Sequence, residues 1–390
     1  ITINNPINTA GITSVTLGSG NFVAGSTAGD SIVSGGNNNT LVGDNAGTAV
    51  TTGDSNTAVG QNCGVSNTTG TENAFFGRQS AQFNTTGNYN TALGTYALMV
   101  NTTASGNTSV GYASLYSNTT GASNVAVGQG ALQNNTTASN NTAVGLSSLQ
   151  TNTTGAENVA VGYRSLLVNT TGYNNTALGA YAQDHNTTGF SNAAVGFAAL
   201  DANTTGDSNT ALGTYALTRA TTASYNVAVG TAAAQSITTG THNIAVGYLA
   251  LEANTTGVYN TAIGQAAGDS VTTGGSNVFI GEAAGGDVTT ASNVTCIGRN
   301  AGLSSSPSGS LTTQHDKIVL GDNGITNAYI KVAWTVTSDQ RDKADITDFT
   351  HGLDYINELR PVNYVWDDRS NYADGISDGS KKKDLPQLGF

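Results

Sequence analysis

The chain repeats one short pattern of apolar and polar positions along most of its length. Each copy starts with asparagine, which is followed by a residue that is usually threonine or valine. A small residue, usually alanine, then a larger aliphatic residue and glycine complete the phrase, as in "NTALG" at 90–94. A second apolar pair and an "NTTG" phrase follow before the next copy begins. The glycine that ends the "NTALG" phrase recurs at positions 43, 60, 77, 94, 111, 128, 145, 162, 179, 196, 213, 230, 247, 264, 281 and 298. Sixteen copies at a constant step of 17 residues indicate a solenoid or a similar array.

One 17-residue unit is too short for two packed helices, but it can hold two short strands and two turns. The phrase "TAVG" is β-rich and ends in glycine, and "ASLYSNTTG" at 113–121 predicts a second strand followed by a turn. We therefore predict a mainly β fold, a parallel β-solenoid or β-roll of about sixteen 17-residue coils. Coils stacked about 4.8 Å apart would form a rod roughly 75 Å long.

Stacking explains why some positions hardly vary, because each residue then lies above its own copy in the next coil. Asparagines can hydrogen-bond side chain to side chain along such a ladder, and glycine permits a backbone angle or close approach that a Cβ would block. Proline would remove a backbone donor, and none occurs between positions 6 and 307. The predicted ladder residues include Asn90, Asn107, Asn124, Asn141 and Asn158, with Gly94, Gly111, Gly128 and Gly145.

Both faces of the predicted strands are apolar, as in a strand that is buried on both sides. We expect the larger residues, such as Val127 and Leu178, to fill the interior of the coil. The alanines, such as Ala126, would then face another chain, and this arrangement predicts a homo-oligomer, most simply a homotrimer. Cys63 and Cys296 occupy positions where other units have alanine, so we expect small buried residues rather than redox groups.

The charge distribution divides the chain near residue 337. Residues 1–337 carry 6 Lys+Arg and 14 Asp+Glu, whereas the 53 residues 338–390 carry 7 and 11. We predict an N-terminal lead-in or cap over 1–38, a repeat shaft over 39–302, a β neck over 303–337 and a distinct domain over 338–390. The net charge of −12 argues against nucleic-acid binding, and no apolar run is long enough for membrane insertion.

The C-terminal segment reads differently from the repeats. "AYIKVAWTVT" at 328–337 alternates as a strand does. Leu353, Ile356 and Leu359 follow helical spacing, and the predicted helix ends at Pro361. This pattern predicts a small α-containing domain.

The phrase "NTAVGxxSL…NTTG" resembles the head repeats of trimeric autotransporter adhesins, and still more the repeat shafts of phage tail fibres. This resemblance implies a left-handed parallel β-roll in a trimer that displays binding sites along a stalk.

The segments "SDQRDK", "GLDYINELRPVNYVW" and the final "GF" resemble the intramolecular chaperone of endosialidase, also called the S74 peptidase domain. In that family "GF" leads into more domain, so we expect 338–390 to be only its start. The resemblance implies a domain that caps phage tail spikes and fibres, helps three chains to register and fold, and in some members cuts itself off.

The chemistry that the resemblance implies is a Ser–Lys dyad, in which a lysine of lowered pKa takes the serine proton. The matching residues are Ser338 as nucleophile and Lys343 as base, with Asp339 and Arg341 in support. The cut would fall just before Ser338. Asp342 stands where many members have an apolar residue, and it would hold Lys343 charged and weaken it as a base. The alternative is that "SDQRDK" is only a polar turn.

Three further patterns have two interpretations each. The "NTT" triplets, at Asn67 and Asn84 for example, are glycosylation sequons as well as turn ladders. Stacked threonines are also found in ice-binding solenoids, although adjacent threonines in a strand face opposite sides. Aromatic rings either shield the coil edges or form a carbohydrate-binding face. They occur before the ladder asparagine or after the glycine: Tyr89, Tyr173, Phe190, Tyr225, Tyr259, Tyr112, Tyr163, Phe197 and Tyr248.

The sequence thus favours a structural tail fibre of a bacteriophage that attaches to a host, located in the virion and extracellular. Its expected partners are two further copies of itself, a host cell-surface receptor for which carbohydrate is one candidate, and other tail proteins. The alternative is a trimeric adhesin on a bacterial cell surface. Enzyme activity would be limited to a single self-cleavage. The histidines are scattered at 185, 242, 315 and 351, so we expect no metal and no cofactor.

Overall fold

A computed structural model describes residues 17–329, 362–365 and 386–389. The chain divides into two compact units, residues 1–327 and 328–390. Each unit is described by itself.

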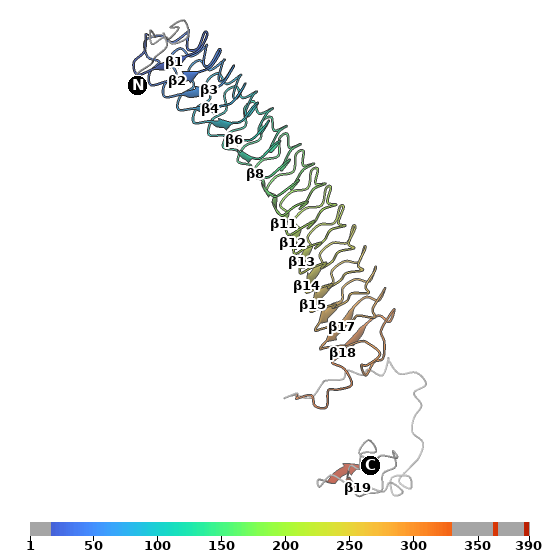
Figure 1. Cartoon of the computed structure of the whole chain (residues 1–390). Helices are drawn as coiled ribbons and strands as arrows, with labels where there is room; N and C mark the ends of the chain where they lie inside the picture. The colour runs from blue at the N-terminus through green and yellow to red at the C-terminus, as the bar shows by residue number, and fades with distance from the viewer. Residues whose placement is uncertain (1–16, 330–361, 366–385, 390) are drawn as a thin grey trace, which may run out of the picture. The chain divides into compact units, whose positions relative to one another are not determined.

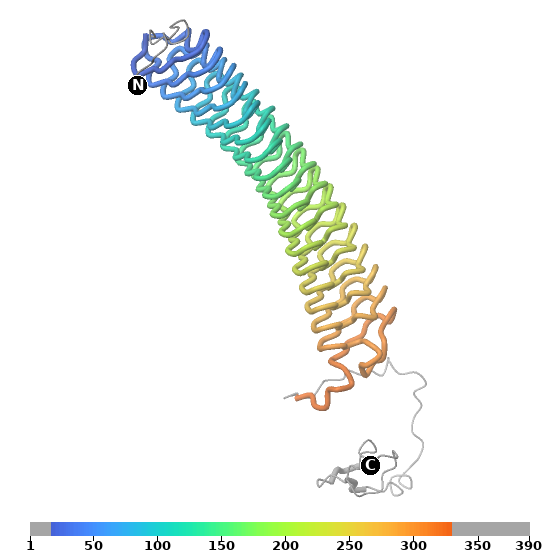
Figure 2. The backbone as a smooth tube through the Cα atoms, in the orientation of Figure 1, coloured from blue at the N-terminus to red at the C-terminus, as the bar shows by residue number. Residues whose placement is uncertain are grey.

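The first unit is a coil that advances by one strand per turn (Figures 1 and 2). Its strands form a single 18-stranded sheet in which each strand pairs in parallel with the next one along the chain. The described residues contain no helix, so the predicted parallel β-solenoid is confirmed. The strands are β1 (Phe22–Ala24), β2 (Thr40–Val42), β3 (Thr57–Val59), β4 (Ala74–Phe76), β5 (Thr91–Leu93), β6 (Thr108–Val110), β7 (Val125–Val127), β8 (Thr142–Val144), β9 (Val159–Val161), β10 (Thr176–Leu178), β11 (Ala193–Val195), β12 (Thr210–Leu212), β13 (Val227–Val229), β14 (Ile244–Val246), β15 (Thr261–Ile263), β16 (Val278–Ile280), β17 (Val294–Ile297) and β18 (Lys317–Leu320).

The offset between paired residues of adjacent strands equals the length of the sequence repeat. Thr108 pairs with Val125, and Val125 pairs with Thr142, so each residue lies beside its copy 17 positions on. The step is longer only at the ends, where Phe22 pairs with Thr40 and Val294 with Lys317. Strands β1 and β18 fall in the segments expected to be the lead-in and the neck.

The predicted second strand of each coil is wrong. Between consecutive repeat strands the chain forms turns, and alternate residues have left-handed backbone angles, such as Ala113 (φ 54°) and Leu115 (φ 47°). These angles lie far from the β region. The amides still pair between coils: Ala113 donates to the Thr95 carbonyl (3.1 Å) and Leu115 to the Ala131 carbonyl (2.9 Å).

The expected orientation of the strands is also wrong. The central alanine, such as Ala126, points into the coil of its own chain and is fully buried, whereas Leu178 at the third strand position is 37% exposed. In such coils the large interior side chain comes from the turn instead, where Leu115 and Leu132 are fully buried. A three-residue strand turns only its middle side chain inward, so the turn leucine fills the remaining space. The alanines therefore give no argument for contact with another chain.

Cys63 and Cys296 are both fully buried, as small residues of the interior. Burial raises the pKa of each thiol to about 11, which keeps both protonated at neutral pH. Neither group is therefore poised for thiolate chemistry.

In the second unit the structure describes two strands, β19 (Val362–Val365) and β20 (Pro386–Gly389), which pair antiparallel. The helix predicted around 353–359 lies outside the described residues. Among the described residues, no helix has the length and apolar character needed to cross a membrane.

The repeat glycine has a specific steric reason. Gly111 has φ +131°, which L side chains rarely adopt, and a Cβ there would lie 2.6 Å from the Gly128 carbonyl oxygen of the next coil. The same close approach occurs along the ladder, for example between Gly94 and Gly111. Glycine is thus required where consecutive coils come closest.

We predict that Gly111→Ala destabilises the rod by about 1–3 kcal/mol or more, because strain and a backbone clash add together. The matched control is Gly130→Ala, since Gly130 (φ 66°) occupies the turn position where other coils carry Ala113 and Ser147 at similar angles. Urea unfolding followed by circular dichroism measures both. Equal midpoints for the two variants would contradict the steric argument.

Candidate functional site

The residues predicted for self-cleavage, Ser338, Asp339, Arg341 and Lys343, lie outside the described residues, and so does Asp342. Their assignment to a catalytic site therefore rests on the sequence alone. The described rod offers five other features: the asparagine ladders, an outward apolar strand face, exposed aromatic columns, an open pocket and a charged cluster.

The first asparagine ladder runs beside the strands and is buried. Asn107 illustrates it: its backbone N–H donates to Asn90 Oδ1 (3.0 Å), and its own Oδ1 accepts from the backbone N–H of Asn124 (3.0 Å). Its Nδ2 donates to the Gly121 carbonyl (2.9 Å). Asn107 is thus linked to the preceding coil through its backbone N–H and to residues of the following turn through its side chain.

The "NTT" asparagines form a second buried ladder. Asn118 Nδ2 donates to Asn101 Oδ1 (2.9 Å) and to the Gly121 carbonyl (2.8 Å), the same carbonyl that Asn107 reaches. Asn67, Asn84 and Asn118 are at most 1% exposed. An attached glycan needs a solvent-facing amide, so these residues act as turn ladders in the folded rod.

The first threonine of each "NTT" phrase is also committed to the ladder. Thr102 donates both its backbone N–H and its hydroxyl to the Thr119 carbonyl, each over 3.1 Å. Only the second threonine, such as Thr103, is exposed. The paired outward threonine array of an ice-binding face is therefore missing in these coils.

An apolar column runs along the outside of the sheet at the third strand position. Its most exposed aliphatic members are between 37% and 50% exposed. The column includes Leu93, Val161, Leu178, Leu212, Ile263, Ile280 and Ile297. Exposed apolar area of this extent commonly marks an interaction surface.

Aromatic rings form columns across the coils. Tyr163, Tyr181, Phe197 and Tyr215 meet edge to face with centroids 5.2–5.8 Å apart. In a second column His242 stacks between Tyr225 and Tyr259, each 4.9 Å away. Mutual shielding is thus observed for many of these rings, as in favourable aromatic pairs, yet several of them remain exposed.

An open pocket of about 270 Å³ lies beside the first aromatic column. Arg164 borders it and also lies 5.5 Å from the centroid of Tyr181. The pocket therefore combines a cation, an amide, a ring and aliphatic side chains: Leu146, Ser147, Gln150, Tyr163, Arg164 and Leu167.

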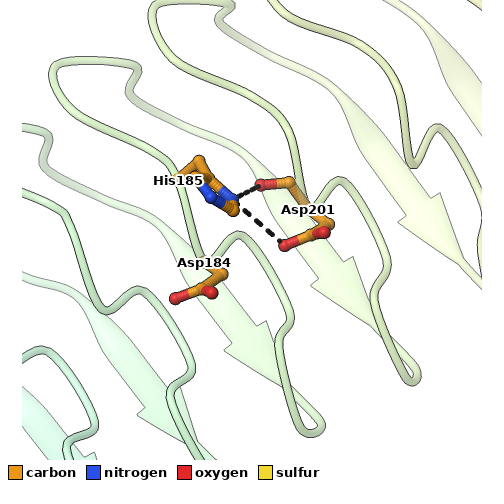
Figure 3. Close-up of side chains that lie close together, drawn as sticks. All are labelled: Asp184, His185 and Asp201. Atoms are coloured by element: carbon orange, nitrogen blue, oxygen red, sulfur yellow. Dashed lines mark hydrogen bonds and ion pairs between the residues drawn. The ribbon is translucent and has the colours of Figure 1, made fainter.

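Two neighbouring coils carry a charged cluster next to this pocket. Asp184 is buried and its Oδ2 lies 3.1 Å from Arg164 Nη2, while Oδ1 has no hydrogen-bond partner. His185 Nδ1 lies 3.4 Å from Asp201 Oδ1 and 3.3 Å from the Asp201 carbonyl oxygen (Figure 3). The contact between His185 and the Asp201 carboxylate is an ion pair only when the imidazole is protonated. Asp201 Oδ1 is buried and has no hydrogen-bond partner.

Burial shifts the pKa of both carboxyls in the same direction. It raises the pKa of Asp184, an effect that Arg164 partly opposes, and it raises the pKa of Asp201, which His185 partly opposes. In the same coil Gln183 fills a position where neighbouring coils carry Leu166 and Leu200, and its buried amide has no partner. Gln183 therefore places a polar side chain in the otherwise apolar interior of this coil.

Sequence reasoning missed this cluster, because it considered the four histidines as isolated residues. A usable signal was present, since Asp184 and Asp201 are 17 residues apart and therefore occupy the same position in adjacent coils.

Comparison with known families adds one result. Residues 338–389 match the peptidase S74 family, described as the chaperone of endosialidase. No curated protein matches the chain. The chain thus carries a chaperone-of-endosialidase domain at its C-terminal end, preceded by the parallel β-solenoid.

Proposed function

We propose that this chain is a structural tail fibre of a bacteriophage that attaches to a host cell, with a C-terminal chaperone that assists assembly of three chains. The observation that carries the proposal is the order of parts along the chain. A solenoid of 18 stacked strands is followed by the segment that matches the chaperone of endosialidase. A long uniform rod suits a spacer between a particle and a surface.

Homotrimer formation is supported by the family match and by the outward apolar column of the sheet. Side chains such as Leu178 and Leu212 are 37% and 46% exposed in the single chain. Burial of apolar area contributes about 25 cal/mol per Å², so the stabilisation of an interface along this column grows with the number of coils it covers. We assign this face to two further copies of the chain.

Attachment to a carbohydrate is supported by the pocket beside Arg164. Sugar rings present C–H faces to aromatic rings and hydroxyls to amides and guanidinium groups. Tyr163 supplies an exposed ring, while Gln150 and Arg164 supply donors around one open pocket of about 270 Å³.

Light scattering of the full chain should give three times its mass of 39.3 kDa. A double variant, Leu178→Lys with Leu212→Lys, should shift the population toward single chains, because the added charges would be buried at the interface. Thr171→Lys, an exposed site elsewhere on the coil, is the control. A monomeric parent would contradict the trimer, whereas a trimeric double variant would contradict only the assignment of this face.

Binding to a glycan array tests the receptor proposal. Tyr163→Ala should lose bound glycans, since stacking on the ring contributes a large part of the contact. The control Tyr248→Ala removes an exposed tyrosine at the same repeat position outside the pocket. An array without bound glycans, or equal loss in both variants, would speak against carbohydrate recognition here.

Self-cleavage is proposed to need Ser338 and Lys343. We expect mass spectrometry of the full chain to show incomplete release of 338–390, because Asp342 favours the charged lysine. Asp342→Leu should raise the released fraction, and Ser338→Ala should abolish release while the control Ser370→Ala does not. Release from the Ser338→Ala variant would exclude the dyad.

A further inference from the structure

We infer that Asp184, His185 and Asp201 form a site for a divalent transition-metal ion of the zinc class, shared between two neighbouring coils. The carboxylate oxygens and the imidazole nitrogen that would serve as ligands lie within 4.8 Å of one another. Ligand atoms on one tetrahedral zinc ion are about 3.4 Å apart, so small side-chain rotations complete the site. Figure 3 shows the three side chains gathered on adjacent turns of the rod.

The unpartnered oxygen of Asp184 points independently to a cation. The Asp184 side chain is only 3% exposed, and Arg164 satisfies one oxygen while Oδ1 has no partner. A buried polar atom without a partner costs free energy of folding. A metal ion bound to Oδ1 removes that cost without displacing Arg164.

The charge balance of the cluster leaves room for a cation. Asp184 and Asp201 are at the same repeat position of adjacent coils, so stacking brings two carboxylates together and they repel. With neutral imidazole, Arg164 supplies one positive charge against two negative charges. A divalent ion changes the sum from −1 to +1 and bridges the two coils.

The donor set selects the class of metal. One imidazole nitrogen and two carboxylates suit zinc and related ions, whereas calcium takes six to eight oxygen ligands. His185 is 58% exposed at its side chain, so solvent reaches the cluster and a water can occupy the remaining position.

A second acidic pair in the rod supplies an internal comparison. Glu252 and Asp269 are also at one repeat position of adjacent coils, and burial raises the pKa of Asp269, as it does for Asp184. There the place of His185 is taken by Ala253. Among the described residues, only the Asp184 cluster brings three metal-type ligands together.

Isothermal titration of the untagged full chain with zinc chloride, after treatment with a chelator, tests the proposal. We expect one bound zinc per chain, and a melting temperature that rises with zinc concentration, because a ligand that binds the folded state stabilises it. His185→Ala and Asp201→Asn should each weaken binding by at least about tenfold. The control His242→Ala removes a histidine that is stacked between two tyrosines elsewhere on the rod and should bind zinc as the parent does.

Absence of zinc binding in the parent would overturn the proposal, and so would binding that His185→Ala leaves unchanged. A titration with calcium chloride that gives equal or tighter binding would overturn the assignment to the zinc class. His185 is exposed, so its substitution leaves the fold intact, and circular dichroism of each variant checks this.

Discussion

The rod depends on one constraint, which is that every coil must place its polar groups opposite the same groups of the next coil. A three-residue strand makes few hydrogen bonds, so the turns must contribute the rest. Buried asparagines such as Asn107 and Asn118 do so by bonding to carbonyls and amides of neighbouring coils. Since an unpaired polar group inside the coil is costly, a shift of one residue would break both ladders at once.

That constraint explains residues whose local backbone angles are unfavourable. Leu115 adopts a left-handed angle that ordinarily costs about 1–2 kcal/mol, yet its side chain is fully buried and its amide pairs with Ala131. Burial of a leucine contributes a comparable or larger free energy. At Gly111 the constraint excludes a side chain altogether, because the approach of the next coil leaves no room for a Cβ.

One group of charged side chains gathers where the sequence departs from the repeat. Asp184, His185 and Asp201 bring charged groups together in two neighbouring coils, and Arg164 joins them from the preceding coil. Stacking amplifies such changes, since residues 17 apart in the sequence become neighbours in space. The same rule makes the outward column of Leu178 and its copies a continuous surface rather than isolated side chains.

The sequence by itself determined the parallel register, the coil length and the ladder positions, because a constant 17-residue step has few other physical solutions. It also carried the chaperone match in the tail, through motifs such as "SDQRDK". It could not decide which strand face points inward, since Ala126 and Val127 are both apolar. Only the tertiary structure decided that, because left-handed turns bring Leu115 and its copies into the interior, where the strand then contributes alanine. Where glycine takes the turn position, as at Gly285, the larger Phe279 fills the interior from the strand.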